Sequence, residues 1–196
     1  MIRTNEKHTR SMRTELRAKP DTDKKVIEGY FAVFDSPTEL WAGAFEKISR
    51  NAFDNTISGD IRALTNHDTS LVLGRTKAGT LKLSVDSHGL YGEITVNEND
   101  TDAMNLYERV KRGDVDQCSF GFYILKESTD WRDDGSVIWT LEEVELFEVS
   151  CCTFPAYKDT GIQAREQQVE QYKNKQLQYW QQSMKERIQN VKSTDA

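Results

Sequence analysis

Cysteine, histidine and proline are scarce in this chain of 196 residues, which has only three of each. The cysteines are Cys118, Cys151 and Cys152, and their spacing matches no metal-binding motif such as CxxC. We therefore expect no metal site and no cofactor. The odd number of cysteines also argues against a disulfide framework and favours a reducing, cytosolic compartment.

Long apolar segments are also missing. No apolar run approaches the ~18 residues that a membrane span needs, and the mean hydropathy is −0.71. Residues 1–20 contain basic side chains but lack the apolar stretch of a secretory signal. These features predict a soluble protein with no membrane partner, and its length suffices for one domain with a sizeable core.

The net charge of −6 is unevenly distributed along the chain. Residues 1–25 carry a charge of +4, residues 26–162 carry −12, and residues 163–196 carry +2. An acidic body lacks the basic face that nucleic-acid binding requires, so we expect no nucleic-acid partner. The composition predicts three parts: a flexible basic arm at 1–25, a folded domain at 26–162, and a tail at 163–196.

The tail is predicted to be helical, because it is rich in glutamine and lacks glycine and proline. An apolar stripe at a spacing of three or four residues follows one face of this helix. Its members are Leu177, Trp180, Met184, Ile188 and Val191. Either this stripe packs on the protein's own domain or it docks on an assembly partner, and the sequence leaves both open.

Alternating apolar and polar residues predict that the central domain is mainly β-structure. The clearest pattern is a hairpin within residues 81–96, where the turn "DSHG" separates two alternating runs. Further strands are expected at 26–36, 61–66 and 118–125, and two more, sharing a bend near Glu145, at 137–157.

Two helices are expected beside these strands. One lies near 100–113, where Asp100 can cap its start and Gly113 can end it. A shorter one is expected at 49–59. The predicted fold class is therefore mainly β with flanking helices, arranged as a closed or partly closed antiparallel barrel with a C-terminal helical tail.

Ser119 is unusual because it lies in "DQCSFGFYIL", a run that otherwise resembles a buried strand. A stiff strand can aim a nucleophile. Neighbouring side chains of a strand point to opposite faces, so Cys118 and Phe120 should face away from Ser119. Gly121 should share its face and leave space for a substrate backbone. Cys118 is a rival nucleophile, although a small core residue is the simpler interpretation.

A serine nucleophile needs a base and a group that orients the base. His67 follows a strand and is the best-placed histidine, because His8 lies in the arm and His88 in a hairpin turn. Glu148 lies between apolar residues of a strand, and a buried carboxylate there requires a partner. Solvent exposure is a sufficient explanation for Glu145. These three residue types alone do not establish an enzyme.

Several short runs, in this order along the chain, resemble the prohead proteases of tailed bacteriophages. They are "GYFAVFDS", "NHD" followed by "LGR", "SFGF", and "FEVS" followed by "PAY". The similarity covers roughly residues 26–160. It implies a capsid-maturation serine protease with the β-barrel fold of the herpesvirus assembly proteases. In this family the histidine of "NHD" is the general base, the serine of "SFGF" is the nucleophile, and the acid before "VS" completes a triad.

The resemblance thus implies that Ser119, His67 and Glu148 are catalytic. Full activity of a Glu148→Gln variant would move the third role elsewhere, with Asp68 as the alternative. It also implies that the substrates are the scaffolding protein or the scaffold-like segment of the major capsid protein, that the enzyme cleaves itself, and that it acts inside the prohead in the host cytoplasm. A homo-oligomer is possible. The oxyanion hole is expected in the turn after "FEVSCCTFP". The alternative is a non-catalytic scaffolding module, or a protease that has lost its activity.

Overall fold

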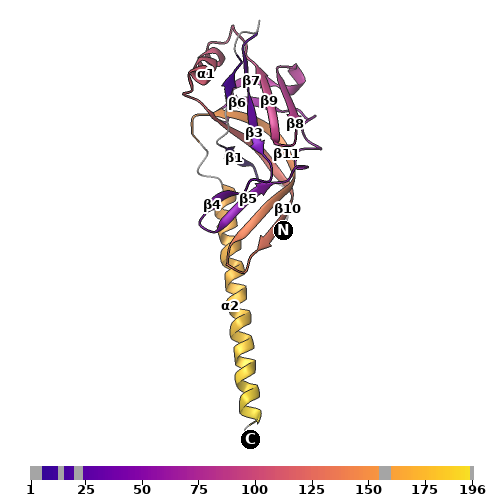
Figure 1. Ribbon diagram of the computed structural model, residues 1–196, viewed down its shortest axis with the longest axis vertical. Helices are drawn as coiled ribbons and strands as arrows, with labels where there is room; N and C mark the ends of the chain where they lie inside the picture. Colours follow the sequence, from indigo (N-terminus) through magenta and orange to yellow (C-terminus); the bar gives the residue numbers. More distant parts are fainter. Residues whose placement is uncertain (1–5, 13–15, 20–23, 155–159, 195–196) are drawn as a thin grey trace. The chain divides into compact units, whose positions relative to one another are not determined.

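The computed structural model describes residues 6–12, 16–19, 24–154 and 160–194. In this part of the chain it contains two β-sheets and two α-helices, which confirms a mainly β protein with helices (Figure 1). The chain divides into two compact units, Met1–Tyr157 and Lys158–Ala196.

The larger sheet is built around one long antiparallel hairpin, β10 (Gln117–Trp131) and β11 (Val137–Cys152). Strand β1 (His8–Met12) extends it along the outer edge of β10. On the other side, β11 pairs in parallel with two strands in succession, β5 (Ala44–Ile48) and β6 (Arg62–Thr65). The sheet is completed by β4 (Thr38–Trp41) beside β5 and β7 (Asp68–Arg75) beside β6.

The smaller sheet has the order β2 (Arg17–Ala18), β3 (Val26–Val33), β9 (Gly89–Thr95) and β8 (Leu81–Val85). Strands β8 and β9 form the predicted hairpin. A single 3-10 turn, η1 (Thr76–Ala78), precedes β8. In Figure 1, β3, β9 and β8 lie side by side.

The core consists of apolar side chains from both sheets. The smaller sheet contributes Ile27, Phe31, Leu90 and Ile94, and the larger sheet contributes Phe120, Phe122, Leu141 and Val149. Because Phe120 and Phe122 point into this core, the alternating residues of β10, Ser119 and Gly121, are directed to the other face. The core thereby determines which side of β10 presents the candidate nucleophile.

Helix α1 (Thr101–Arg112) is confirmed with the predicted ends. The side chain of Asp100 accepts hydrogen bonds from the backbone N–H groups of Asp102 and Ala103. Gly113 closes the helix with a left-handed φ of 86°, which glycine adopts at no steric cost. The apolar face of α1 packs on the core through Ala103, Leu106, Tyr107 and Val110.

The closed antiparallel barrel is not confirmed. The described strands form two separate sheets, neither of which closes on itself. The larger sheet is also not purely antiparallel, because β11 pairs in parallel with β5 and β6. Alternation along single strands predicts which face is buried, but it carries no information on the direction of a partner strand that is distant in sequence.

The prediction of a flexible arm at 1–25 is wrong for the described part of that segment. Residues 8–12 form β1 and residues 17–18 form β2, and both strands add to the edge of a sheet. An edge strand presents a row of unpaired backbone N–H and C=O groups. Pairing with these groups gives the polar segment order that its own composition does not predict.

Two local predictions are also corrected. Residues 51–58 form consecutive turns rather than a helix, with bonds such as Asp54 N to Asn51 O and Thr56 N to Phe53 O. Asparagine and aspartate compete for backbone hydrogen bonds and favour turns. The two strands expected at 137–157 are one strand, β11. Its pairing with β10 contains register shifts where the bend was expected.

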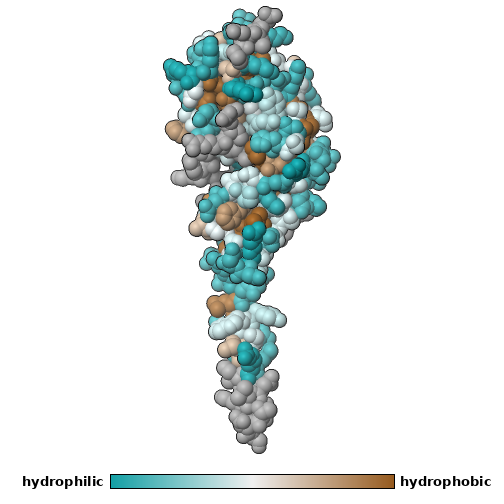
Figure 2. All heavy atoms as spheres, in the orientation of Figure 1, coloured by the Kyte–Doolittle hydropathy of each residue, from teal (hydrophilic) through white to brown (hydrophobic). Residues whose placement is uncertain are grey.

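Helix α2 (Thr160–Thr194) occupies the segment of the predicted tail. Its surface in Figure 2 is mostly hydrophilic, interrupted by small apolar areas. Two members of the apolar stripe, Leu177 and Trp180, are 51% and 58% exposed. The side chains of Ile188 and Val191 lie outside the described residues. None of the helices in the described ranges is long and apolar enough to cross a membrane.

Candidate active site

His67 lies in the two-residue loop between β6 and β7. Asn66 and His67 have φ values of 50° and 62°, as a type I′ hairpin loop requires at both central positions. Asn66 ties this loop to β11, because its N–H donates to the carbonyl of Cys151 and its side-chain oxygen accepts from the N–H of Thr153. A histidine in the left-handed region is under strain of about 1–2 kcal/mol. Such strain is typical of functional residues.

Glu148 and Ser150 hold His67 from the neighbouring strand β11. The Nδ1 atom of His67 lies 2.5 Å from Oε1 of Glu148. The other carboxylate oxygen accepts a hydrogen bond of 2.7 Å from the Ser150 hydroxyl, whose oxygen accepts from the backbone N–H of His67 at 3.1 Å. The carboxylate of Glu148 is almost fully buried, at 4% exposure. The partner that its burial demands is therefore His67, supported by Ser150.

This environment strongly changes the acid–base behaviour of His67. Burial disfavours the charged imidazolium, but hydrogen bonds with Cys152 and Glu148 outweigh burial and raise the pKa of His67 from 6.5 to about 10. Below that pH the ring is held as a cation beside the carboxylate. In the arrangement described here, only roughly one ring in a thousand is neutral at pH 7.

Ser119 lies on β10 directly opposite Ser150 of β11. Directly opposed residues of an antiparallel pair share a face, with Cβ atoms ~5 Å apart. Ser119 therefore shares its face with the residues that hold His67. Its hydroxyl, however, donates to the backbone carbonyl of Arg10 in β1 at 2.9 Å, and the residue is fully buried.

The hydroxyl of Ser119 and the imidazole of His67 are thus on one face but are not joined. Among the hydrogen bonds of the described residues, none links these two side chains. Side chains occupy discrete staggered rotamers. A change of χ1 rotamer would release the Ser119 hydroxyl from Arg10 and turn it away from β1.

Cys152 occupies the remaining position on the imidazole. Its Sγ atom lies 3.9 Å from Nε2 of His67, the nitrogen that a serine nucleophile would use. Neither Cys152 nor Ser150 was expected at the site from the sequence. Period-two alternation along β11 could have identified both, because Glu148, Ser150 and Cys152 share one face.

The other candidates from the sequence lie apart from this cluster. Cys118 belongs to the buried core on the opposite face of β10. Glu145 is solvent-exposed, as expected. Asp68 accepts hydrogen bonds from the backbone and side chain of Ser70, and His67 is bound through Glu148 instead. The expected oxyanion region near residues 155–159 lies outside the described residues.

Gly121 leaves room for side chains of the neighbouring strand β11. It faces Glu148 across the β10–β11 pair. A Cβ atom at this position would collide with Oε1 of Glu148 and with the ring of Phe147. The missing side chain therefore leaves space for the carboxylate that binds His67.

A cavity of about 400 Å³ opens beside the imidazole. Two of its lining residues, Lys7 and Thr9, come from β1 or the residue before it. The others are Arg62, Leu64, His67, Thr69, Val72, Phe147 and Glu148. The cavity combines apolar walls with one titratable pair, which is typical of a ligand-binding site.

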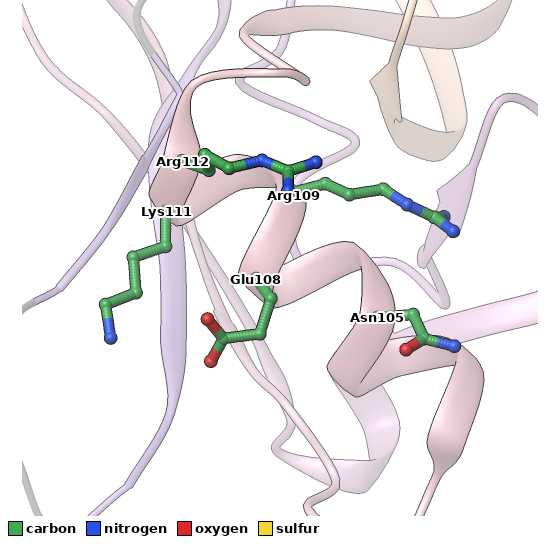
Figure 3. Close-up of a pocket in the computed structure, with 5 residues that line it drawn as sticks. All are labelled: Asn105, Glu108, Arg109, Lys111 and Arg112. Carbon is green, nitrogen blue, oxygen red and sulfur yellow. The ribbon is translucent and has the colours of Figure 1, made fainter.

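A second hollow lies on helix α1 and is shown in Figure 3. Its described lining consists of Asn105, Glu108, Arg109, Lys111 and Arg112. These side chains include no serine, cysteine or histidine. This hollow therefore lacks the nucleophile and base that the cluster around His67 provides.

Comparison with known proteins adds independent information on the chain. The model of the family described as caudovirus prohead serine protease matches residues 12–175. The prohead protease of Enterobacteria phage HK97 is 28% identical over 158 residues, and the match covers 77% of this chain and 64% of that relative. The structure of the bacteriophage T4 capsid assembly protease, gp21, aligns with a TM-score of 0.46 at 12% identity, over 76% of this chain and 98% of that one.

Proposed function

The chain belongs to the family of caudovirus prohead serine proteases, and we propose that it is a serine endopeptidase of phage capsid maturation. The observation that supports this proposal most directly is the contact of His67 with Glu148 on the face of the sheet that also carries Ser119. These are the three residue types of a serine protease triad. They come from three separate strands or loops of one sheet.

In the proposed mechanism, neutral His67 removes the proton of Ser119 as the serine oxygen attacks a peptide carbonyl carbon. Glu148 stabilises the imidazolium that forms. The imidazolium then gives its proton to the departing amine, and an acyl-enzyme remains. Water, deprotonated by His67, attacks the acyl carbonyl and releases the acid and the free serine.

The substrates that we propose are the scaffolding protein, or the scaffold-like segment of the major capsid protein, inside the prohead in the host cytoplasm. We also propose self-cleavage, homo-oligomerisation, and the division into a protease domain at 26–162, to whose sheets β1 and β2 are added, and a tail at 163–196. Support comes from the family match, since the residues matched span most of the chain.

The decisive test is covalent labelling of Ser119 with a fluorophosphonate, detected by intact-protein mass spectrometry on the free chain and on proheads. Ser119→Ala should abolish labelling and reduce processing by about 10⁶-fold. Glu145→Gln is a matched control, because Glu145 is exposed. Normal maturation in a His67→Ala/Ser119→Ala double variant would instead identify a non-catalytic scaffolding module.

A thiol nucleophile is the second candidate, because Cys152 lies nearest to Nε2 of His67. Cys152→Ser distinguishes the two. If Ser119 is the nucleophile, this variant keeps fluorophosphonate labelling and processing. Loss of processing in Cys152→Ser, together with full processing in Ser119→Ala, would assign the reaction to the thiol.

A further inference from the structure

Strand β1 lies against the candidate nucleophile as a peptide substrate would. It is an extended segment that pairs antiparallel with β10, with Ser11 opposite Ser119 and Arg10 opposite Phe120. The carbonyl oxygen of Arg10 is 2.9 Å from the Ser119 hydroxyl. Addition of an extended peptide to a sheet edge is a common mode of peptide recognition.

The side chain of Arg10 is held by a buried acid. Its Nε and Nη2 atoms bind the two carboxylate oxygens of Glu46, the second at 3.0 Å. The side chains of Arg10 and Glu46 are only 11% and 4% exposed. The Arg10 guanidinium also lies over the ring of Phe122. A bidentate pair of this kind selects a basic side chain by geometry as well as by charge.

Residues on the other face of β1 reach the cavity beside His67. Thr9 and Lys7 line this cavity, and the Lys7 ammonium lies over the ring of Phe147. Alternate side chains of the segment thus fill two different sites, the Glu46 site and the His67 cavity. This alternation is how an extended peptide is read along a sheet edge.

Three observations distinguish β1 from a substrate about to be cleaved. The Ser119 hydroxyl donates its hydrogen to the Arg10 carbonyl, so its proton is not directed at His67. Ser119 is fully buried beneath the strand. The family match begins at residue 12, so four of the five residues of β1 precede it. The segment therefore pairs with the edge of β10, although most of it lies outside the residues that match the family.

We propose that the edge of β10 is the peptide-binding site, that β1 occupies it in a self-inhibited state, and that Glu46 selects an arginine or lysine immediately before the scissile bond. This inference rests on the proposed function. The substrate class is an extended peptide with a basic residue in the position of Arg10. Such a peptide must displace β1 before Ser119 can react.

The first test uses Arg10→Glu, which places two carboxylates together and should expel β1 while keeping Glu46. Fluorophosphonate labelling of Ser119 should become at least about ten-fold faster than in the unchanged chain. The matched control is Arg50→Glu, which reverses a cation in the exposed pair with Asp35; its labelling rate should not change. If Arg10→Glu fails to fold, as judged by circular dichroism, His8→Pro disrupts β1 pairing, because the N–H of His8 lies on the same side of β1 as the Arg10 carbonyl and faces β10.

The second test measures selectivity in the released background with two peptidyl diphenyl phosphonates that differ only in carrying arginine or glutamate beside phosphorus. The serine oxygen forms a bond to phosphorus, a phenoxide leaves, and the serine proton ends on phenol. For this test the released background is His8→Pro, which keeps both Arg10 and Glu46. The arginine probe should react at least about ten-fold faster, and Glu46→Gln should remove most of this preference.

The outcomes separate the two proposals. Equal labelling rates in the unchanged chain, Arg10→Glu and His8→Pro would overturn the inference and leave the proposed function intact. Equal rates for the two phosphonates would overturn the role of Glu46 in selectivity and leave the proposed function intact. If no probe labels Ser119 in any folded variant, free or in proheads, the proposed function fails and the inference fails with it.

Discussion

Glu148→Gln tests the central pair of the candidate site. The change keeps the shape of the side chain and removes its charge, 2.5 Å from Nδ1 of His67. At an effective dielectric constant of ~20, unit charges ~3 Å apart attract by roughly 5 kcal/mol, or about 4 pKa units. The pKa of His67 is raised from 6.5 to about 10 although burial opposes the shift. Without the carboxylate, we expect the pKa of His67 to fall, with the contact to Cys152 as the remaining interaction that raises it against burial.

The assay is a titration of the imidazole signals by NMR. The chain has only three histidines, His8, His67 and His88, so a His67→Gln variant identifies the signal. Glu145→Gln, which removes an exposed carboxylate from the same strand, should leave the midpoint unchanged. A His67 midpoint that is the same in Glu148→Gln as in the unchanged chain would refute the reasoning.

The same shift has consequences for activity and stability. Because a general base must be neutral, labelling of Ser119 should increase with pH until about 10. In Glu148→Gln it should level off at a lower pH, at a maximum reduced by about 10⁴-fold. A pKa that folding raises stabilises the native state fully below the unfolded pKa of ~6.5. That contribution is lost as the pH rises towards 10. The difference in unfolding free energy between the unchanged chain and Glu148→Gln should therefore shrink as the pH rises from ~6.5 towards 10.

Three further substitutions test the support of the site and the fold. Ser150→Ala removes the hydroxyl that binds one Glu148 oxygen and the His67 backbone. The free energy of unfolding in urea should therefore fall by about 1–3 kcal/mol, and the midpoint of the His67 titration should shift. Ser150→Thr should restore both quantities. Gly121→Ala should displace the Glu148 carboxylate and lower the pKa of His67, and an unchanged NMR titration would count against the packing described. Asp100→Ala should lower the free energy of unfolding by ~1 kcal/mol, because the helix cap is lost. The labelling rate of Ser119 should not change. Thermal unfolding would check the first expectation and mass spectrometry the second.

Local patterns predicted the elements whose causes are local. The β8–β9 hairpin follows from alternation around "DSHG", and α1 follows from its periodicity and from Asp100 and Gly113 at its ends. The parallel partners of β11 could not be predicted in this way. They are separated from it by up to about a hundred residues, and the pairing is decided by burial and backbone geometry of the whole sheet.

Some features of the candidate site could be predicted from local sequence patterns, and others could not. Alternation correctly placed Ser119 and Gly121 on one face and Cys118 on the other. The pairing of His67 with Glu148 came from the family resemblance, because no spacing rule connects positions 67 and 148. The strained loop at Asn66 and His67 also gave no sequence signal, since neither residue is the glycine that usually marks a positive φ. The catalytic roles stay predictions until labelling tests them.

The self-inhibited state differs from a reactive one in two ways, and the exchange of β1 for a substrate can correct both in two steps. The Ser119 hydroxyl is bound to β1, and His67 is held as a cation that cannot accept a proton. Departure of β1 frees the hydroxyl but leaves the imidazolium. A substrate that then fills the cavity of about 400 Å³ excludes water from the ring. Since burial disfavours the charged form, we expect substrate binding to lower the pKa of His67 and to prepare the base only when a peptide is in place.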